Sequence, residues 1–326
     1  AYQVKALTID GSGILLLAIC VGSLQWMLER GERMDWFDSR FVTALGVTAV
    51  VSFVALIWRE LSIKEPIIDL RVLKNRQLAG GVMIGAFLGF ALYGSVFVLP
   101  VFLQGLHGMT ANQTGMIILP GALSSAFTMA IVGKNSAKLD ARVTVPIGAS
   151  LFLYSMWSLS RLTFDSGAQD LFWPLVSRGV GLGLIFVPLT GATMAELKPS
   201  QLAQGTGMFN LTRQLGGSLG IAISATLLSR FTAQSRALLA EHVVIGDPTT
   251  VARLDGLTRA LIGKGMNVLS AKQQALMILD RQLQGQASVL AFSKLYLLSG
   301  IALMASLPLL LLFRSGKSRG HGPPAH

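Results

Sequence analysis

The sequence predicts an all-α integral membrane protein that crosses the bilayer eight times. Of its 326 residues, 52% are hydrophobic and only 13% are charged, whereas a soluble domain carries roughly a quarter charged residues. A soluble globule of this size cannot bury so many apolar side chains, so the surplus must face lipid. The apolar residues also form continuous runs instead of alternating with polar ones, which indicates helices and not the strands of a membrane barrel.

Eight apolar segments are long enough to cross a hydrocarbon core of roughly 30 Å at a rise of about 1.5 Å per residue. All 16 Asp and Glu residues lie outside these segments, as expected for helices in contact with lipid. The spans are expected near residues 11–28, 41–58, 79–104, 113–133, 143–160, 171–195, 205–229 and 287–313.

The basic residues of the short connections predict the orientation, because Lys and Arg favour cytoplasmic loops. One set of connections contains Lys5, Arg59, Lys64, Arg71, Lys74, Arg76, Lys134, Lys138, Arg142, Lys198, Arg314, Lys317 and Arg319. The opposite set contains only Arg30, Arg33, Arg40 and Arg161, when the long loop 230–286 is left out as the rule requires. The asymmetry predicts a multi-pass protein with both termini of this chain in the cytoplasm.

Several of the predicted spans contain proline. Pro100 and Pro120 stand on either side of a short turn, and Pro146, Pro174 and Pro188 fall within or at the edge of later spans. Proline removes a backbone donor and kinks or loosens a helix, which a membrane tolerates where a neighbouring helix or water satisfies the freed carbonyl. Such helices are typical of the moving or substrate-lining parts of transporters, although a static packing kink explains any single proline equally well.

Three cations lie inside predicted spans, namely Arg178, Arg213 and Lys294. A charge at mid-bilayer costs about 3 kcal/mol on insertion scales, so each needs a physical reason. Snorkelling toward the headgroups suits Lys294 and competes with a role in the substrate pathway for Arg213. Arg178 is followed by Gly179, Gly181 and Gly183, which favour close helix packing beside a water-lined face.

The loop 230–286 is polar, with apolar residues at helical spacing. Val251, Leu254, Leu257 and Leu261 share one predicted helix face, and a second helix is expected around Leu276. Two interpretations stay open, a helical hairpin lying on the outer face of the membrane and a docking surface for a periplasmic adaptor.

Other classes of protein are disfavoured by the distribution of charge and of reactive residues. The formal charge of +11 is spread over many short loops and forms no basic face for nucleic acid. A membrane enzyme would need facing acid–base or metal-binding groups, but the four His residues lie in loops or the tail, and no metal or cofactor site is expected. The single Cys20 excludes a disulfide framework within the chain.

Particular stretches resemble major facilitator drug exporters of the EmrB/QacA type, which are fourteen-span drug:proton antiporters. "LPVFLQGLHGMTANQTGMIILPGAL" (99–123) resembles the first helical hairpin of their C-terminal bundle. "GSLQWMLERGERMDWFDSRF" (22–41) resembles their central two-helix insert, and "EPIIDLRVLKNRQL" (65–78) resembles the cytoplasmic connection after it. "RGVGLGLIFVPLTGATMAELKPSQLAQGTGMFNLTRQLGGSLGIA" (178–222) resembles the next conserved block of the family.

The resemblance implies a major facilitator half-bundle with inverted three-helix repeats. Residues 1–78 would form the central insert and its cytoplasmic connection, and residues 79–326 the C-terminal six-helix bundle with the outer loop 230–286. The bundle would divide into the triplets 79–160 and 171–313. A partner N-terminal six-helix half, absent before Ala1, would carry the acidic residues that couple transport to protons.

The function that the resemblance implies is proton-coupled efflux of hydrophobic or amphipathic compounds by alternating access. The alternative is a non-transporting remnant or a regulatory partner subunit of the membrane. The expected partners are the lipid bilayer, the missing N-terminal half, small-molecule cargo and, for some relatives, a periplasmic adaptor with an outer-membrane channel.

The family's architecture implies that the first two helices of each triplet line the substrate cavity. The expected substrate-pathway residues are Tyr93, Phe97, Gln104, Phe127, Arg178, Phe186, Asn210, Arg213 and Gln214. The expected gating or hinge residues are Pro100, Pro120, Gly133, Asp140, Arg142 and Pro188, of which Gly133, Asp140 and Arg142 belong to the loop "GKNSAKLDAR" (133–142) that resembles a superfamily motif. Lys294 stands where the family commonly has an acidic residue, and this departure predicts a different preference for cargo.

Overall fold

The computed structural model describes residues 10–63, 75–135, 139–164, 166–195, 197–241 and 248–312, and within these ranges every regular element is a helix. An all-α fold is therefore confirmed. The α-helices are α1 Gly11–Arg30, α2 Arg40–Ser62, α3 Arg76–His107, α4 Ala111–Lys134, α5 Ala141–Leu159, α6 Ala168–Met194, α7 Leu202–Ala240, α8 Pro248–Ile262 and α9 Val268–Ser306. Short 3₁₀ helices are η1 Glu32–Met34, η2 Trp36–Asp38, η5 Pro199–Gln201 and η6 Leu307–Leu312.

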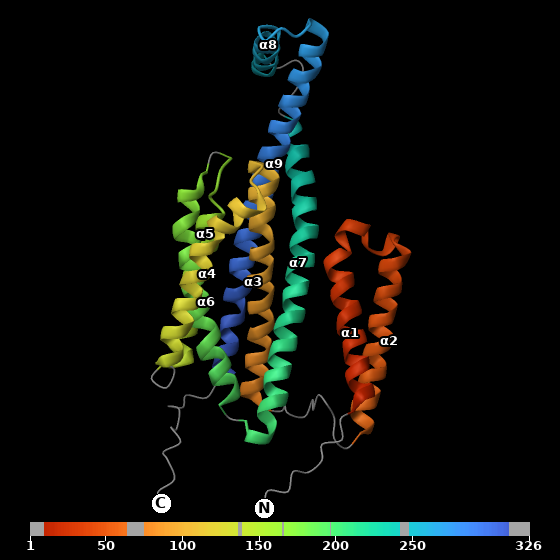
Figure 1. Ribbon diagram of the computed structural model, residues 1–326, viewed down its shortest axis with the longest axis vertical. Helices are drawn as coiled ribbons and strands as arrows, with labels where there is room; N and C mark the ends of the chain where they lie inside the picture. The colour runs from red at the N-terminus through yellow and green to blue at the C-terminus, as the bar shows by residue number, and fades with distance from the viewer. Residues whose placement is uncertain are drawn as a thin grey trace, which may run out of the picture.

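Helices α1 and α2 form a hairpin beside the rest of the molecule (Figure 1). Asp10 connects the two helices at the open end of the hairpin. Its carboxylate caps α1 by accepting from the Gly13 backbone N–H at 3.0 Å and pairs with Arg59 of α2 at 2.7 Å. The hairpin touches the bundle mainly through α1 and α7. Most of its apolar surface is left uncovered by protein, as expected for helices in contact with lipid.

Helices α3 to α7 and α9 form a single bundle. Along one layer α4 packs on α6, α6 on α3, and α3 on α7, while α5 and α9 contact each other and pack behind this layer. The pairing of α3 with α7 matches that of α6 with α4, and the pairing of α3 with α9 matches that of α6 with α5. These matches are expected if the helices form two inverted triplets, in which α3, α4 and α5 correspond to α6, α7 and α9.

The close packing of this layer depends on glycine. A Cβ on Gly89 of α3 would overlap the backbone carbonyl of Arg213 on α7. Likewise, a Cβ on Gly179 of α6 would overlap the Gly121 carbonyl and the Ser124 hydroxyl on α4. Without a strong hydrophobic drive between helices in lipid, such backbone contact is how membrane helices gain van der Waals energy.

Judged by length and apolar composition alone, six helices of the described residues could cross a membrane: α1, α2, α3, α4, α6, and α9 with its continuation to Leu311. The remaining two bundle helices, α5 and α7, pack against these spans. Helix α5 has only 19 residues and begins beside Arg142, and α7 is rich in Gly, Ser, Thr and Gln. The count of eight spans therefore stays a prediction.

The turn between α3 and α4 is specified by its own residues. Gly108 takes the left-handed conformation (φ 63°) that ends α3, which glycine adopts without strain. Thr110 and Gln113 then form a reciprocal capping box at the start of α4, with bonds of 3.3 and 2.9 Å. Both helices continue without interruption through their prolines, Pro100 and Pro120.

Beyond the bundle, α7 and α9 extend side by side and carry α8 at their tip (Figure 1). We call this part, residues 230–241 and 248–286, the stalk. The predicted helices of the loop 230–286 are thus present: the extensions of α7 and α9 project along the long axis of the molecule, and α8 lies across their tip (Figure 1). An ion pair between Arg236 and Asp280 at 2.6 Å joins α7 to α9, and Arg253 of α8 donates to Gln282 at 3.0 Å.

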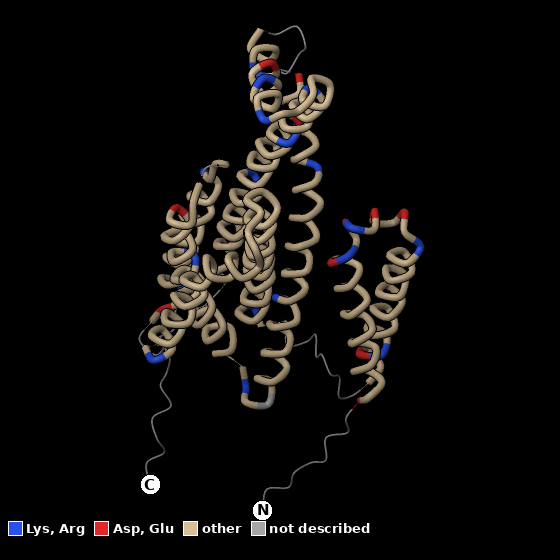
Figure 2. The backbone as a smooth tube through the Cα atoms, turned by 45° about the horizontal axis from the view of Figure 1, so that its top comes forward, with Lys and Arg blue, Asp and Glu red and all other residues tan. Residues whose placement is uncertain are grey.

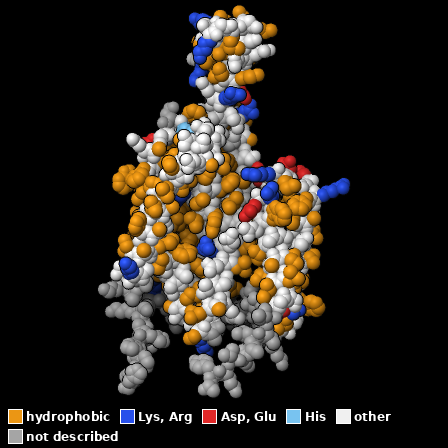
Figure 3. All heavy atoms as spheres, in the orientation of Figure 1, with side chains coloured by type: hydrophobic (Ala, Val, Ile, Leu, Met, Phe, Trp, Pro, Cys, Tyr) orange, Lys and Arg blue, Asp and Glu red, His pale blue; other side chains and the backbone are white. Residues whose placement is uncertain are grey.

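Charged residues gather on the stalk and at helix ends, and few lie along the middle of the bundle (Figure 2). Hydrophobic side chains cover much of the facing surface of both the hairpin and the bundle (Figure 3). This separation of charge from apolar surface is typical of a protein whose middle lies in hydrocarbon.

Candidate functional site

The candidate site is an arginine surrounded by aromatic rings where α3, α6 and α7 meet. The guanidinium of Arg213 on α7 donates from Nη1 to the Tyr93 hydroxyl on α3 at 3.1 Å. Its carbon lies 5.6 Å from the ring centre of Phe186 on α6 and 6.0 Å from that of Tyr93. Phe209, one helical turn before Arg213, packs edge-on against Phe186 with ring centres 6.5 Å apart. We call these four residues the Arg213 cluster.

The helix packing holds the Arg213 cluster in place. Gly217 leaves space for the Tyr93 ring, which a Cβ there would penetrate. Gly85 does the same for the Phe209 ring, which is fully buried. Because these rings cannot move without separating α3 from α7, Arg213 is held by a rigid surround.

The charge of Arg213 is only partly compensated. Its Nε is buried and has no hydrogen-bond partner among the described residues, and neither of the two ion pairs found there involves Arg213. Aromatic faces attract the cation at about 0.5–2 kcal/mol each. The guanidinium can therefore still bind an anionic group such as a carboxylate, with aromatic rings beside it for an apolar body.

Arg178 lies elsewhere, in the core of the bundle. It is 5% exposed, and its Nη1 has no hydrogen-bond partner among the described residues. Tyr296 of α9 is 1% exposed and has an equally unpartnered hydroxyl. Arg178 is thus buried by its own bundle, apart from the Arg213 cluster.

The other expected pathway residues are spread over the bundle. Asn210 and Gln214 flank Arg213 on α7, the first exposed and the second partly buried. Phe97 lies nearer the outer end of α3 and lines a cavity described below, and Gln104 is exposed close to the end of that helix. Phe127 is 67% exposed on α4.

The expected gating residues have local roles in the structure. Asp140 caps α5 by accepting from the Arg142 backbone N–H at 2.9 Å. Gly133 lies in the last turn of α4 with open space where a Cβ would be. Residues 136–138 of this loop lie outside the described ranges. Pro188 is buried within α6, which stays helical throughout.

Sequence reasoning overlooked Phe209 and Tyr296. Phe209 precedes Arg213 by four residues, a spacing that places both side chains on one helix face and would have identified it. No sequence signal relates Tyr296 to Arg178, because they come from different helices. Near Tyr296, Lys294 lies 5.3 Å from the ring centre of Phe231, a contact that shields its charge near the base of the stalk.

Within the part of the chain that the structure describes, no group of three His, Cys, Asp or Glu side chains lies close enough to hold a metal ion. The Arg213 cluster itself offers a cation, a hydrogen-bonding hydroxyl and aromatic surface.

Comparison with known proteins identifies the family. Residues 11–221 match the model of the Major Facilitator Superfamily. The chain is 32% identical to the multidrug export protein EmrB of Escherichia coli strain K12, over 89% of this chain and 56% of that protein. It is 29% identical to the fatty acid resistance protein FarB of Neisseria gonorrhoeae, over 96% of this chain and 60% of that protein.

A solved bacterial homologue of the human lysosomal transporter Spinster resembles 92% of this chain and 68% of its own at 17% identity and a TM-score of 0.47, too distant a likeness to carry an argument. The chain spans little more than half the length of the curated relatives it matches. The family model covers most of the chain, including the hairpin and the bundle helices as far as α7. The chain therefore belongs to the major facilitator superfamily, with multidrug and fatty acid resistance exporters among its relatives.

Proposed function

We propose that this chain is part of a proton-coupled exporter of amphipathic compounds that works by alternating access. The Arg213 cluster is the observation that carries the proposal, because it presents a cation and two partly exposed rings from the helices expected to line the cavity. An amphipathic molecule with an anionic group would place that group on Arg213 and its apolar body against Tyr93 and Phe186.

The proposal includes a partner six-helix half. Apolar side chains on α4 stay exposed at successive turns, namely Leu119, Leu123, Phe127 and Ile131. In the layer formed by α4, α6, α3 and α7, helix α4 lies at one edge and α7 at the other. A second bundle placed against both edges would therefore enclose the Arg213 cluster. Such a half would also supply acidic residues, which the described part of the bundle has only at helix ends and in the stalk. We place both termini of this chain in the cytoplasm, on the basis of the Lys and Arg distribution.

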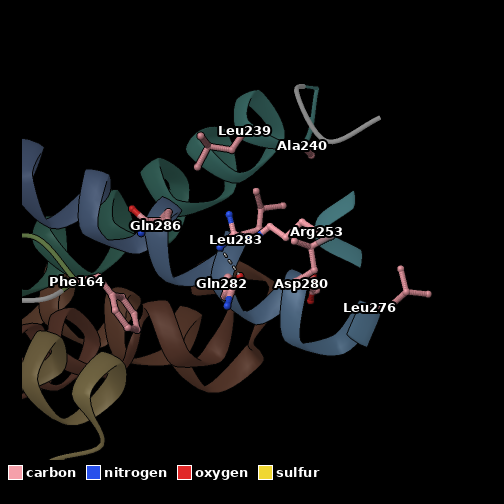
Figure 4. A pocket seen from close by; sticks show the side chains of 10 residues that line it. Phe164, Leu239, Ala240, Arg253, Leu276, Asp280, Gln282, Leu283 and Gln286 are labelled. Carbon is pink, nitrogen blue, oxygen red and sulfur yellow. Dashed lines mark hydrogen bonds between the residues drawn. The ribbon is translucent and has the colours of Figure 1, made fainter. Parts of the chain in front are cut away.

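A periplasmic adaptor is a further proposed partner, which would dock on the stalk. Val268, Leu269 and Met277 are exposed apolar residues there. A cavity of about 720 Å³ opens beside them between the stalk helices (Figure 4). Leu239, Leu283 and Phe164 line it together with Arg253 and the paired Asp280, so it offers both apolar and charged contacts.

The test is transport by this chain co-expressed with a six-helix N-terminal bundle from a matched relative. We expect export of a fluorescent fatty acid by the pair and none by the chain alone. The Arg213→Gln variant should lower export at least about tenfold, because a lost charged contact costs about 1.5–3 kcal/mol.

The Arg230→Gln variant is the matched control, because it removes an exposed cation from the same helix beyond the cluster. Equal export by both variants would contradict the role of Arg213. Export by the chain alone would contradict the need for a second half.

A further inference from the structure

A second cavity separates the outer end of the α1–α2 hairpin from the bundle. Its volume is about 1040 Å³, at the upper end of the roughly 300–1,000 Å³ typical of ligand sites. The hairpin contributes Leu28, Glu29, Glu32 and Arg33 to one wall, and α3, α7 and α9 form the others. We call it the hairpin cavity. It is separate from the Arg213 cluster, none of whose residues lines it.

The inner part of the hairpin cavity is apolar. Phe97, Val101 and Leu106 line it from α3, Leu228 from α7 and Phe292 from α9. On α7 the apolar lining runs from Ile221 to Leu228, a rise of about 10 Å at 1.5 Å per residue, and more polar lining continues to Arg236 at the rim. This apolar length accommodates part of an acyl chain, and each buried CH₂ contributes about 0.8 kcal/mol.

The outer rim of the same cavity carries charges of both signs. Glu29 and Glu32 lie on the hairpin side, where they accept only from neutral donors, Gln25 and Trp36, each at 3.1 Å. Arg33 and Arg281 also line the rim. Apart from the Arg236–Asp280 pair, none of these charges forms an ion pair with another described residue.

The level of this rim fits a membrane interface. It lies where α1 ends at Arg30 and where α3 ends at His107, and the stalk begins beyond it. In Figure 3, acidic and basic side chains lie close together beside the gap between hairpin and bundle, above a surface rich in hydrophobic side chains. Lipid headgroups occupy this level of a bilayer, directly outside the hydrocarbon.

We propose that the hairpin cavity binds a zwitterionic phospholipid with an ammonium group, such as phosphatidylethanolamine. Arg33 and Arg281 would hold its phosphate, Glu29 and Glu32 its ammonium, and the apolar lining one acyl chain. An anionic lipid would satisfy the arginines and leave the glutamates unpaired. The bound lipid would join the hairpin to the outer half of the bundle, where the two parts otherwise meet mainly through α1 and α7. This site does not depend on the proposed transport function.

The experiment is photo-labelling of the full chain in detergent micelles by phosphatidylethanolamine with a diazirine in one acyl chain. We expect labelling of the peptides that contain residues 97–106 and 221–236. The Glu29→Gln/Glu32→Gln variant should label about tenfold less, as expected when a charge-assisted contact worth about 1.4 kcal/mol or more is lost. In the same variant, labelling by the matching phosphatidylglycerol probe should stay within about twofold of its labelling of the wild-type chain.

Controls separate this site from general lipid contact. The Arg33→Gln/Arg281→Gln variant should lower labelling by both probes, whereas Arg30→Gln and Asp38→Asn, at the same end of the hairpin but outside the cavity, should change neither. Excess free phosphoethanolamine should not compete, because it lacks the acyl chain. The proposal is overturned if both probes label wild type and all variants equally, or if the free headgroup abolishes labelling. The substituted residues are exposed except for Glu32, which is partly buried, and an unchanged melting temperature of each variant verifies folding.

Discussion

The three cations within the predicted spans differ in what surrounds their charge. Arg213 has a hydroxyl and two rings, whereas Lys294 has the ring of Phe231 and a position near the stalk. Arg178 has neither a carboxylate partner nor solvent within the described structure. Burying such a cation costs free energy of folding unless water or backbone oxygens reach it. We therefore infer that Arg178 has a structural role in the core of the bundle.

Asp10 supplies a pH-dependent contact at the end of the hairpin. Its hydrogen bond with Arg59 holds the pKa of the Asp10 carboxyl well below its ordinary value of 3.8, and the bond from the Gly13 backbone N–H lowers the pKa further. Because the folded-state pKa is depressed, the stabilisation is fully present above pH 3.8 and is lost as the pH falls below that value toward the folded-state pKa.

We therefore expect Asp10→Asn to lower the melting temperature of the chain in detergent at pH 6 and to have a progressively smaller effect at pH 3 and below. The measurement is thermal unfolding followed by fluorescence. Asp38→Asn removes an exposed acid at the other end of the hairpin, serves as the control and should show no such trend. A constant effect of Asp10→Asn across this pH range would contradict the assignment.

At the scale of elements, the glycines of α3 and α7 determine how the candidate site is built. Gly85, Gly89 and Gly217 allow the backbones to approach until the Tyr93 and Phe209 rings are enclosed. Elsewhere in the chain, glycines such as Gly115 face open space and serve no such contact. Substitution by Ala thus has opposite expected effects at the two kinds of position.

Gly89→Ala should destabilise the bundle by about 1–3 kcal/mol, because the new Cβ meets the rigid carbonyl of Arg213. Gly115→Ala should instead stabilise by about 0.5–1 kcal/mol, since it only improves helix propensity on α4. Denaturant unfolding in mixed micelles measures both variants. Equal effects of the two substitutions would show that the close approach of α3 and α7 does not stabilise the fold.

At the scale of the whole molecule, the apolar surfaces of the hairpin and of α4 look alike but have different expected neighbours. Val54 on α2 and Phe127 on α4 are both exposed. We expect Val54 to face lipid in every state, and Phe127 to face the partner half once it is present.

A spin label at Phe127→Cys, in a chain with Cys20→Ser, should be accessible to oxygen dissolved in lipid when the chain is alone. Co-assembly with the N-terminal bundle should lower that accessibility severalfold, as expected for a buried protein interface. The label at Val54→Cys should remain accessible in both preparations. Loss of accessibility at Val54 and not at Phe127 would place the interface on the hairpin.

Much of the local structure could be predicted from the sequence because its causes are local. Continuous apolar runs identified the hairpin and bundle helices, and apolar spacing identified the helices of the stalk. Gly108, Thr110 and Gln113 carry the signals of a helix stop followed by a helix start. The prolines were less informative, since the helices continue through Pro100, Pro120 and Pro188.

The candidate site was predicted only in part. Tyr93, Phe186 and Arg213 were expected in one pathway, and the structure brings them together. Phe127 and Gln104 were expected in the same pathway; both are exposed outside the Arg213 cluster, so their role in the pathway stays a prediction. Residues on different helices share no sequence signal for distance, so only packing could separate these two groups.

The sequence by itself determined that this protein is a helical membrane protein, because hydrophobic length, charge distribution and local caps act over a few turns of chain, and its resemblance to drug exporters indicated the major facilitator family. Tertiary structure alone decided which cation is buried, which cation is enclosed by rings, and where the hairpin leaves a cavity with charges of both signs. These outcomes depend on backbone contacts between helices far apart in sequence, such as Gly89 with Arg213, and on where the stalk and hairpin come to lie.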